Sequence, residues 1–240
     1  MIRKETNGIA YLQFELLAEH KDVSHGVFLR GNDFTLSKGD REHVFANRKK
    51  AQEILNIPKL IASYQVHGAD VHEACPEDSS ETMKCDAFMT IHRNLGLMVK
   101  HADCQGTLIY DPVCKAIATV HSGWRGSIQN IYQKTIDSLQ KRYGSHPKDL
   151  LVCIGPSLGP QSAEFIHYKK ELPEPFWEYR VNENHFDFWE ISKHQLIDCG
   201  VLPDHIEIAG IDTKTEPEDC FSYRRDKNTG HHGSIIALTA

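Results

Sequence analysis

The stretch His101–Gly126, HADCQGTLIYDPVCKAIATVHSGWRG, predicts the centre of the fold. Two apolar runs, CQGTLIY and KAIATVH, flank a short segment in which Pro112 stands where a tight turn accepts its fixed φ. We therefore expect a β-hairpin. With a two-residue turn in simple register, Cys104 and His121 are cross-strand partners on one face, with Cβ atoms roughly 5 Å apart. A thiol and an imidazole so placed can share a metal ion or form a nucleophile–base pair.

The segment after the hairpin changes from strand to helix. Ser122–Gly126 is a glycine-flanked turn, and residues 127–143 follow it as a predicted helix, so the turn is a place where an anion can bind. Arg125 lies in this turn, and its guanidinium can clamp a phosphate or a carboxylate with two hydrogen bonds, or form a surface ion pair. Trp124 can stack on a flat base or belong to the core.

Composition limits the classes of protein that fit. The chain has 240 residues, of which 40% are hydrophobic, enough for a substantial core. The formal net charge is −6, and basic residues form no stripe, so we expect no nucleic-acid partner. No run of about 18 apolar residues occurs, so we expect no membrane partner either. The N-terminal segment lacks the apolar core of a signal peptide, and we interpret it as the first strands.

The cysteines favour a reduced, cytoplasmic protein. There are seven, an odd number, and they are spread along the chain without a CxxC pair. A disulfide framework is therefore not expected.

Strand and helix patterns alternate throughout the chain. Residues 40–56 have apolar residues at helical spacing, and so does the stretch from Phe188 to Gly200. Short apolar runs between the helices read as strands, and Phe221–Leu238 reads as a final pair of strands around a turn. No linker divides the chain. We predict one α/β domain (α+β in its segregated parts) over residues 1–240, with mixed β-sheets covered by helices.

Three residues at predicted strand ends, His67, Cys104 and His121, form a candidate metal site. Neutral imidazole and thiolate suit zinc at about 2.0–2.3 Å, and three protein ligands leave a fourth position for substrate. The alternative is that the histidines are hydrogen-bonded structural residues and the cysteine a small buried hydrophobe. His101 and His72 are rival ligands, although alternation along a strand turns His101 away from Cys104.

Other polar residues near these positions have two interpretations. Asp103 can orient a ligand, contact substrate or act as the general acid, or it can cap a turn. Tyr223–Asp226 is a short charged patch, and patches of this kind usually face solvent.

These motifs occur in an order that resembles one family. Gln-Val-His-Gly at 65–68, Ala-Asp-Cys at 102–104 and His-Ser-Gly-Trp-Arg-Gly at 121–126 precede Gly-Pro at 155–156 and Phe-Ser-Tyr-Arg-Arg-Asp with Thr-Gly at 221–230. This pattern resembles the YfiH family, also called the laccase-domain or multicopper polyphenol oxidoreductase family, from about Gly26 onward.

The resemblance implies a YfiH-like single domain with zinc on His67, Cys104 and His121. It implies phosphorolysis of adenosine, inosine, guanosine and methylthioadenosine, with deamination of adenosine. The substrates are then a small purine nucleoside and phosphate, and we expect Gln65, Arg125 and Arg225 to contact them, with Cys104, Arg125 and Asp103 as catalytic residues. We expect a monomer or a weak homo-oligomer.

Three alternatives stay open. A copper-dependent polyphenol oxidase uses the same ligands with another metal. A cysteine hydrolase acting on peptidoglycan precursors uses Cys104 as nucleophile and His121 as base. A non-catalytic interaction protein uses the histidines structurally. The chain also departs from the family pattern in the shortened segment 31–39, a predicted polar loop, at Gln105-Gly106 and at His231. We expect these positions to affect substrate specificity.

Overall fold

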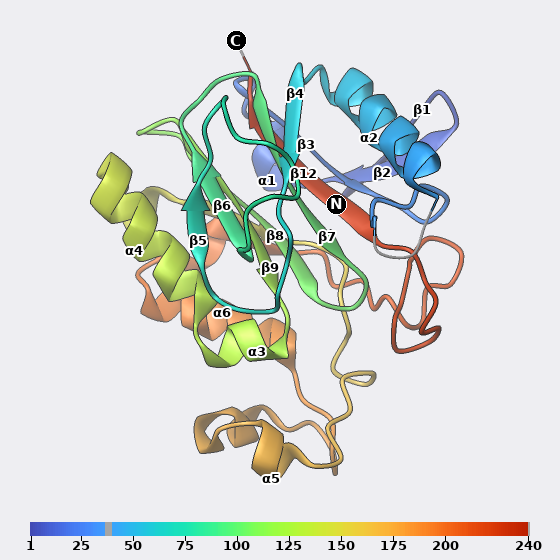
Figure 1. The fold of residues 1–240 in the computed structure, drawn as a ribbon. Coiled ribbons are helices and arrows are strands. Elements are labelled where there is room, and N and C mark those ends of the chain that lie inside the picture. The colour runs from blue at the N-terminus through green and yellow to red at the C-terminus, as the bar shows by residue number, and fades with distance from the viewer. Residues whose placement is uncertain (37–39, 240) are drawn as a thin grey trace.

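Two six-stranded mixed β-sheets form the centre of the protein, which is seen here as a computed structural model describing residues 1–36 and 40–239 (Figure 1). The first sheet has the strand order β1-β2-β3-β12-β7-β4, and the second has the order β11-β10-β8-β9-β6-β5. The strands of the first sheet are β1 (Ile2–Thr6), β2 (Ile9–Gln13), β3 (Val23–Phe28), β4 (Lys59–Ala62), β7 (Leu95–His101) and β12 (His232–Leu238). Those of the second are β5 (Val71–Glu73), β6 (Ala87–Thr90), β8 (Gln105–Asp111), β9 (Ala116–Ser122), β10 (Leu151–Ile154) and β11 (Ile206–Ile208).

Helices cover the outer faces of both sheets, so the molecule has four layers. The α-helices are α1 (Glu15–Ala18), α2 (Arg41–Leu55), α3 (Trp124–Ile128), α4 (Ile131–Tyr143), α5 (Tyr168–Glu171) and α6 (Phe188–Asp198). Short 3-10 turns are η1 (Pro147–Asp149), η2 (Glu174–Tyr179) and η3 (Pro203–His205). Helix α2 packs on the first sheet, and α4 and α6 pack on the second (Figure 1). The predicted class, mixed sheets covered by helices, is confirmed.

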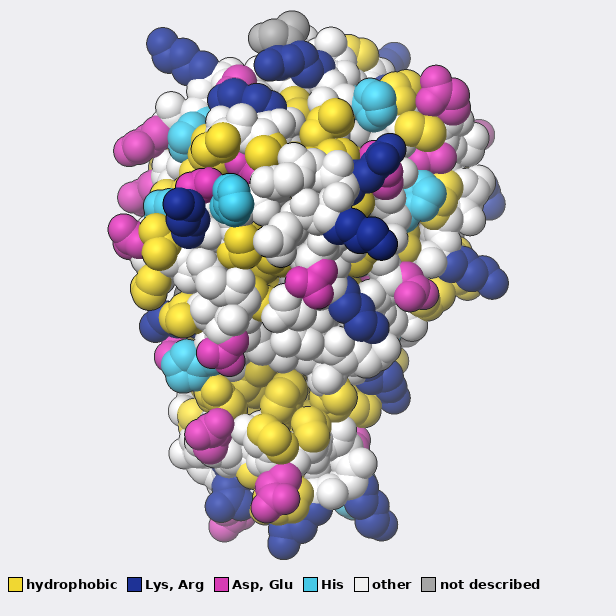
Figure 2. All heavy atoms as spheres, turned by 90° about the vertical axis from the view of Figure 1, so that its left-hand side faces the viewer, with side chains coloured by type: hydrophobic (Ala, Val, Ile, Leu, Met, Phe, Trp, Pro, Cys, Tyr) yellow, Lys and Arg dark blue, Asp and Glu magenta, His cyan; other side chains and the backbone are white. Residues whose placement is uncertain are grey.

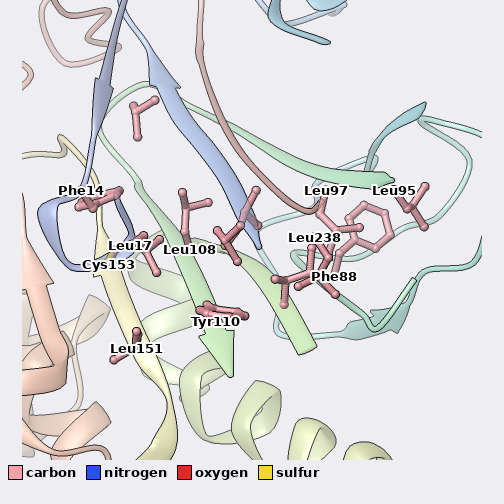
Figure 3. Packing of buried hydrophobic residues seen from close by; sticks show 14 of the residues in the cluster. Phe14, Leu17, Phe88, Leu95, Leu97, Leu108, Tyr110, Leu151, Cys153 and Leu238 are labelled. Carbon is pink, nitrogen blue, oxygen red and sulfur yellow. The ribbon is translucent and has the colours of Figure 1, made fainter. Parts of the chain in front are cut away.

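The main core lies between the two sheets. Strands of both sheets contribute apolar side chains to it, and each one that is fully buried stabilises the fold by roughly 1.5–3 kcal/mol. The labelled members in Figure 3 are Phe14, Leu17, Phe88, Leu95, Leu97, Leu108, Tyr110, Leu151, Cys153 and Leu238.

The predicted helix over residues 40–56 is confirmed as α2. The Asp40 side chain accepts a hydrogen bond from the Glu42 amide at the start, and Asn56 ends the helix in the left-handed conformation. The predicted helix over residues 127–143 is divided into α3 and α4. The division falls at Asn130, whose φ is 49° and whose side chain caps the first turn of α4.

The central hairpin exists, but its predicted register is wrong. Asp111 pairs with Ala116 and Gly106 with His121, so the loop has four residues and the register is shifted by two. The Asp111 carboxylate accepts hydrogen bonds from the amides of Val113 and Cys114, and this extra turn lengthens the loop. A shift by an even number leaves every side chain on its predicted face.

The predicted final pair of strands is also wrong. Only β12 forms, because it lies between β3 and β7 and is hydrogen-bonded on both edges. No edge is left for a hairpin partner, and residues 221–230 fold as successive turns instead. The predicted polar loop at 31–39 falls partly on residues 37–39, which lie outside the described residues.

An aromatic lobe projects from the body of the molecule below α3 (Figure 1). It is built from residues 164–187, which have no clear period in the sequence. Its rings pack on one another and on Trp124 of α3, for example Phe165 against Trp124 at 5.9 Å between centroids. Hydrophobic side chains gather in this part of the surface, above a charged tip (Figure 2).

Candidate metal centre

The side chains of His67, Cys104 and His121 converge at one end of the second sheet. One ligand atom from each lies within 4.8 Å of the other two. His67 comes from the irregular segment between β4 and β5, Cys104 directly precedes β8, and His121 lies near the end of β9. His121 is buried, Cys104 is half-buried and His67 is exposed. The cluster is therefore closed by protein on one side and accessible on the other.

Asp86 organises this cluster from below. Its carboxylate is fully buried and accepts hydrogen bonds from the backbone amides of Val66, His67 and Gly68 at 2.8–3.1 Å. It also bonds Nδ1 of His121 at 2.8 Å. One carboxylate thus holds two of the three candidate ligands in place.

The hydrogen bond to Asp86 decides which nitrogen of His121 faces the cluster. Burial alone would raise the pKa of Asp86, but His121 and the amides of Gly68 and Val66 outweigh it and lower the pKa. An ionised carboxylate only accepts, so Nδ1 of His121 carries a proton. Nε2 is then the atom available to a metal, as in the carboxylate–histidine–metal arrangements of many enzymes.

Charge separation between Cys104 and His121 is favoured. Burial opposes the Cys104 thiolate, yet His121 and His67 outweigh burial and lower the Cys104 pKa to about 6. Burial likewise opposes the charged form of His121, but Cys104 and Asp86 raise the His121 pKa to about 9. A thiolate beside imidazoles is the donor set that zinc and copper prefer.

Gly123 closes one wall of the cluster with bare backbone. A Cβ atom there would lie 3.0 Å from Sγ of Cys104 and 3.2 Å from Cδ2 of His67. Gly123 is also the residue before α3, so the short helix starts directly against the ligands.

Neither rival ligand belongs to the cluster. His101 ends β7 in the first sheet, is fully buried, and bonds Oγ of Ser234 at 2.8 Å. The chain crosses to the second sheet between His101 and Cys104, so strand alternation is not what separates the two. His72 pairs with the Asp78 carboxylate at 2.9 Å.

Arg125 lies in the first turn of α3, four residues after the candidate ligand His121. Its guanidinium stacks on the Trp124 ring at 4.1 Å from the centroid and is exposed. It forms no ion pair with any residue in the described ranges 1–36 and 40–239.

The other predicted site residues have their polar atoms engaged by protein. The Asp103 carboxylate accepts from Thr213 Oγ1 at 2.7 Å and from the Arg224 amide at 2.5 Å. The Arg225 guanidinium donates to backbone carbonyls of Thr213, Lys214 and Cys220.

Gln65 is engaged in the same way. Its amide nitrogen donates to the Lys100 carbonyl at 2.7 Å, and its amide oxygen accepts from the Lys100 amide at 2.8 Å.

Asp86 is the residue that the sequence analysis missed. It stands in Cys-Asp-Ala before an apolar strand, where an aspartate is unremarkable in sequence. The one available signal is a carboxylate placed at the start of a buried run, which requires several partners.

Known proteins resemble this chain over most of its length. A family model described as multi-copper polyphenol oxidoreductase laccase matches residues 16–239. The chain belongs to this family.

Relatives in this YfiH family cover most of the chain. A purine nucleoside phosphorylase of Bacteroides thetaiotaomicron is 30% identical over 244 residues, which cover 89% of this chain and 90% of that protein. The purine nucleoside phosphorylase YfiH of Escherichia coli is 29% identical over 208 residues, 82% of each chain. The crystal structure of the hypothetical protein YfiH of Bacillus licheniformis aligns with a TM-score of 0.87 at 25% identity, covering 98% of this chain and 100% of that one.

The residues present fit a metal ion, as expected for the YfiH family. Three donors converge, the thiolate is favoured, and a buried carboxylate orients one imidazole. None of the helices in residues 1–36 and 40–239 is both long and apolar enough to cross a membrane.

Proposed function

We propose that this chain is a zinc-dependent purine nucleoside phosphorylase that also deaminates adenosine. The observation that carries the proposal is the open His67–Cys104–His121 cluster in a chain 30% identical to a purine nucleoside phosphorylase. The substrates are purine nucleosides, namely adenosine, inosine, guanosine and methylthioadenosine, together with phosphate.

His67, Cys104 and His121 hold the zinc in this proposal, through one imidazole nitrogen each from the histidines and the thiolate sulfur. Zinc bound there supplies a Lewis acid that stabilises negative charge developing on the substrate. Asp86 keeps His67 and His121 in their ligand geometry and does not touch the substrate.

Arg125 binds phosphate. Its planar guanidinium is held flat by the Trp124 ring, is exposed, and has no ion-pair partner among residues 1–36 and 40–239. Holding phosphate beside the ribose converts an encounter of two substrates into a reaction within one complex. Electrostatic stabilisation by the same cation adds to the effect.

We propose structural roles for Asp103, Gln65 and Arg225, because their polar groups bond other parts of the protein. Both Asp103 oxygens accept hydrogen bonds from Thr213 and Arg224, so this carboxylate ties two loops to the Cys104 corner. We assign Asp103, like Gln65 and Arg225, to positioning and not to the proton donation expected from the sequence.

A cysteine hydrolase is the second candidate. Cys104, His121 and Asp86 stand in the order of nucleophile, base and orienting carboxylate, which is the arrangement of a catalytic triad. This function would act on an amide, such as one in a peptidoglycan precursor, and would require no metal.

A multicopper oxidase has less support. Reduction of oxygen to water takes four electrons and several coppers, and residues 1–36 and 40–239 contain one group of three candidate ligands. Because copper binds such ligands more tightly than zinc, metal taken up during purification is not a guide to the native metal.

The test combines metal content with turnover. Protein produced without added copper should contain zinc near one per chain. It should release purine base from inosine and adenosine only when phosphate is present.

Cys104→Ala should lose both properties, and Arg125→Gln should keep the zinc and show a raised KM for phosphate. Zinc-loaded protein that turns over no purine nucleoside contradicts the proposal. Activity that survives chelation, with substrate covalently attached to Cys104, supports the hydrolase instead.

A further inference from the structure

His67 lies in a segment that has no strand ladder to hold it. Strand β4 ends at Ala62 and β5 begins at Val71, and the segment 63–70 between them has backbone pairing only near its two ends, at Tyr64 and Asp70. His67 itself has a φ of 58°, a left-handed conformation that is uncommon for a residue with a side chain. Something other than secondary structure must hold this ligand in position.

Side chains of other elements replace the missing ladder. Asp86 binds the amides of residues 66–68, as described above. On the other side of the segment, Lys100 of β7 makes three contacts. Its Nζ donates to the Ser63 carbonyl at 2.9 Å, and its backbone amide and carbonyl bond the two ends of the Gln65 amide.

The Lys100 ammonium is itself held in a buried charged cluster. Nζ lies 2.7 Å from both carboxylate oxygens of Glu81, and Nη2 of Arg48 from α2 lies 2.6 Å from one of them. Lys100 is 8% exposed and Arg48 is 6% exposed. Burying two cations around one carboxylate is costly, so the cluster is poorly explained by stability alone.

We propose that Lys100 is a positioning residue for the metal ligand His67. Its ammonium acts through the Ser63 carbonyl, and its backbone acts through the Gln65 side chain. A lysine ammonium donates in three directions and carries four methylenes, so it can reach from β7 to a carbonyl and a carboxylate at once. Glu81 and Arg48 hold the ammonium in place, and the ammonium holds Ser63 at the start of the segment that contains His67. The inference rests on the metal site of the proposed function and not on the reaction.

The test is zinc affinity, measured by competition with a chromophoric chelator. Lys100→Met removes the ammonium group but keeps an unbranched side chain only one atom shorter, and Glu81 keeps Arg48 as its partner. Loss of an outer contact to a metal ligand typically weakens binding roughly 10- to 100-fold, and we expect about tenfold here. Lys115→Met is the matched control, because Lys115 also pairs with a carboxylate, Asp22 at 2.6 Å, but on the central hairpin loop. It should leave zinc affinity within about twofold of the original protein.

Combining Lys100→Met with a substitution of one metal ligand distinguishes positioning of His67 from general destabilisation of the fold. When Lys100→Met is added to His67→Ala, zinc affinity should fall by less than about twofold, because the ligand that Lys100 positions is absent. In Cys104→Ser, which keeps a weaker oxygen donor in place of the sulfur, Lys100→Met should keep its full effect on zinc affinity. An equal loss in both backgrounds, or no loss in the original protein, overturns the inference.

Gln65→Met is the second variant if Lys100→Met does not fold. It breaks both bonds to the Lys100 backbone and should give a comparable loss of affinity that also disappears with His67→Ala. Normal zinc binding in a folded Gln65→Met protein would overturn the inference as well. Failure of the proposed function is distinguishable, since phosphorolysis can be absent while these affinity differences are present.

Discussion

Single residues decide whether the three candidate ligands can meet. His67 and His121 are 54 positions apart by their numbers, and no local pattern relates them. Asp86 relates them in space, because one carboxylate accepts from the backbone of the first and from Nδ1 of the second. Its burial without this set of partners would cost several kcal/mol.

Replacing the Asp86 carboxylate should weaken metal binding. Asp86→Asn keeps the shape but cannot accept from Nδ1 of His121 and from three amides at once, so we expect zinc affinity to fall roughly 10- to 100-fold. Asp78→Asn is the matched control, because Asp78 also bonds a histidine, His72, and a backbone amide, that of Cys75. Competition titrations should show normal affinity in the control. Equal affinity in both variants would contradict the role assigned to Asp86.

The thiolate character of Cys104 gives a pH-dependent prediction. Burial opposes the charge, but His121 and His67 lower the Cys104 pKa to about 6, so in metal-free protein the reactive form should appear as pH rises through 6. The pKa values of the other six cysteines are raised. Iodoacetamide at neutral pH should therefore modify Cys104 first, as shown by peptide mapping. Uniform labelling, or a rate that rises only above pH 8.5 like an ordinary thiol, is the opposing result.

At the scale of elements, the central hairpin shows why Cys104 and His121 lie on one face although the predicted register is wrong. The true pairing moves each partner by two residues, and an even shift keeps Cys104 and His121 on the same face as diagonal neighbours. A shift by one residue would have placed the thiol and the imidazole on opposite faces.

The junction of β9 and α3 should accept no side chain. Gly123→Ala places a Cβ 3.0 Å from Sγ of Cys104, so we expect zinc affinity to fall on the order of tenfold. Gly68→Ala is the control, because its Cβ would meet Asp86 and Val66 only at 3.6 Å, an ordinary contact. Metal binding measured for both proteins should differ. Unchanged zinc affinity in Gly123→Ala would show that the ligands can shift to accommodate the added Cβ.

At the scale of the whole molecule, buried histidines connect the outer segments to the first sheet. Nε2 of His25 in β3 accepts from the Phe14 amide at 2.8 Å. Nε2 of His232 in β12 accepts from the Phe221 amide at 3.0 Å, while its Nδ1 bonds the Phe28 carbonyl. Each ring must be neutral to accept these bonds.

Acid should therefore destabilise the fold. Burial is the main cause that lowers the pKa of His25 and of His232 to about 4, below their unfolded value of 6.5. The stabilisation from each neutral ring is complete above pH 6.5 and is lost progressively as pH falls from 6.5 to about 4, on the order of 3 kcal/mol for each ring. Urea unfolding at pH 7 and at pH 4.5 should show the loss.

A variant tests whether the histidines cause this acid sensitivity. The amide oxygen of Gln in His25→Gln can still accept from Phe14 and does not titrate, so the pH dependence of its unfolding free energy should be shallower. An unchanged dependence would place the acid-sensitive groups elsewhere.

Local sequence patterns determined the elements and the chemical types of the candidate ligands. Asp40 and Asn56 mark the two ends of a helix, and the apolar runs on either side of Pro112 form a hairpin. Two imidazoles and a thiol stand at or near strand ends. These features act over a few residues, so the linear order contains them.

The tertiary structure alone decided which groups meet. The Asp86–His121 bond spans 35 positions and the Asp103–Thr213 bond spans 110. Partners at such separations depend on how the sheets stack. This is why Asp86 went unpredicted, why Gln65 and Arg225 turned out to bond backbone, and why β12 lies between two strands. Burial then set the charges, because a pKa responds to the groups that packing brings near and not to neighbours in sequence.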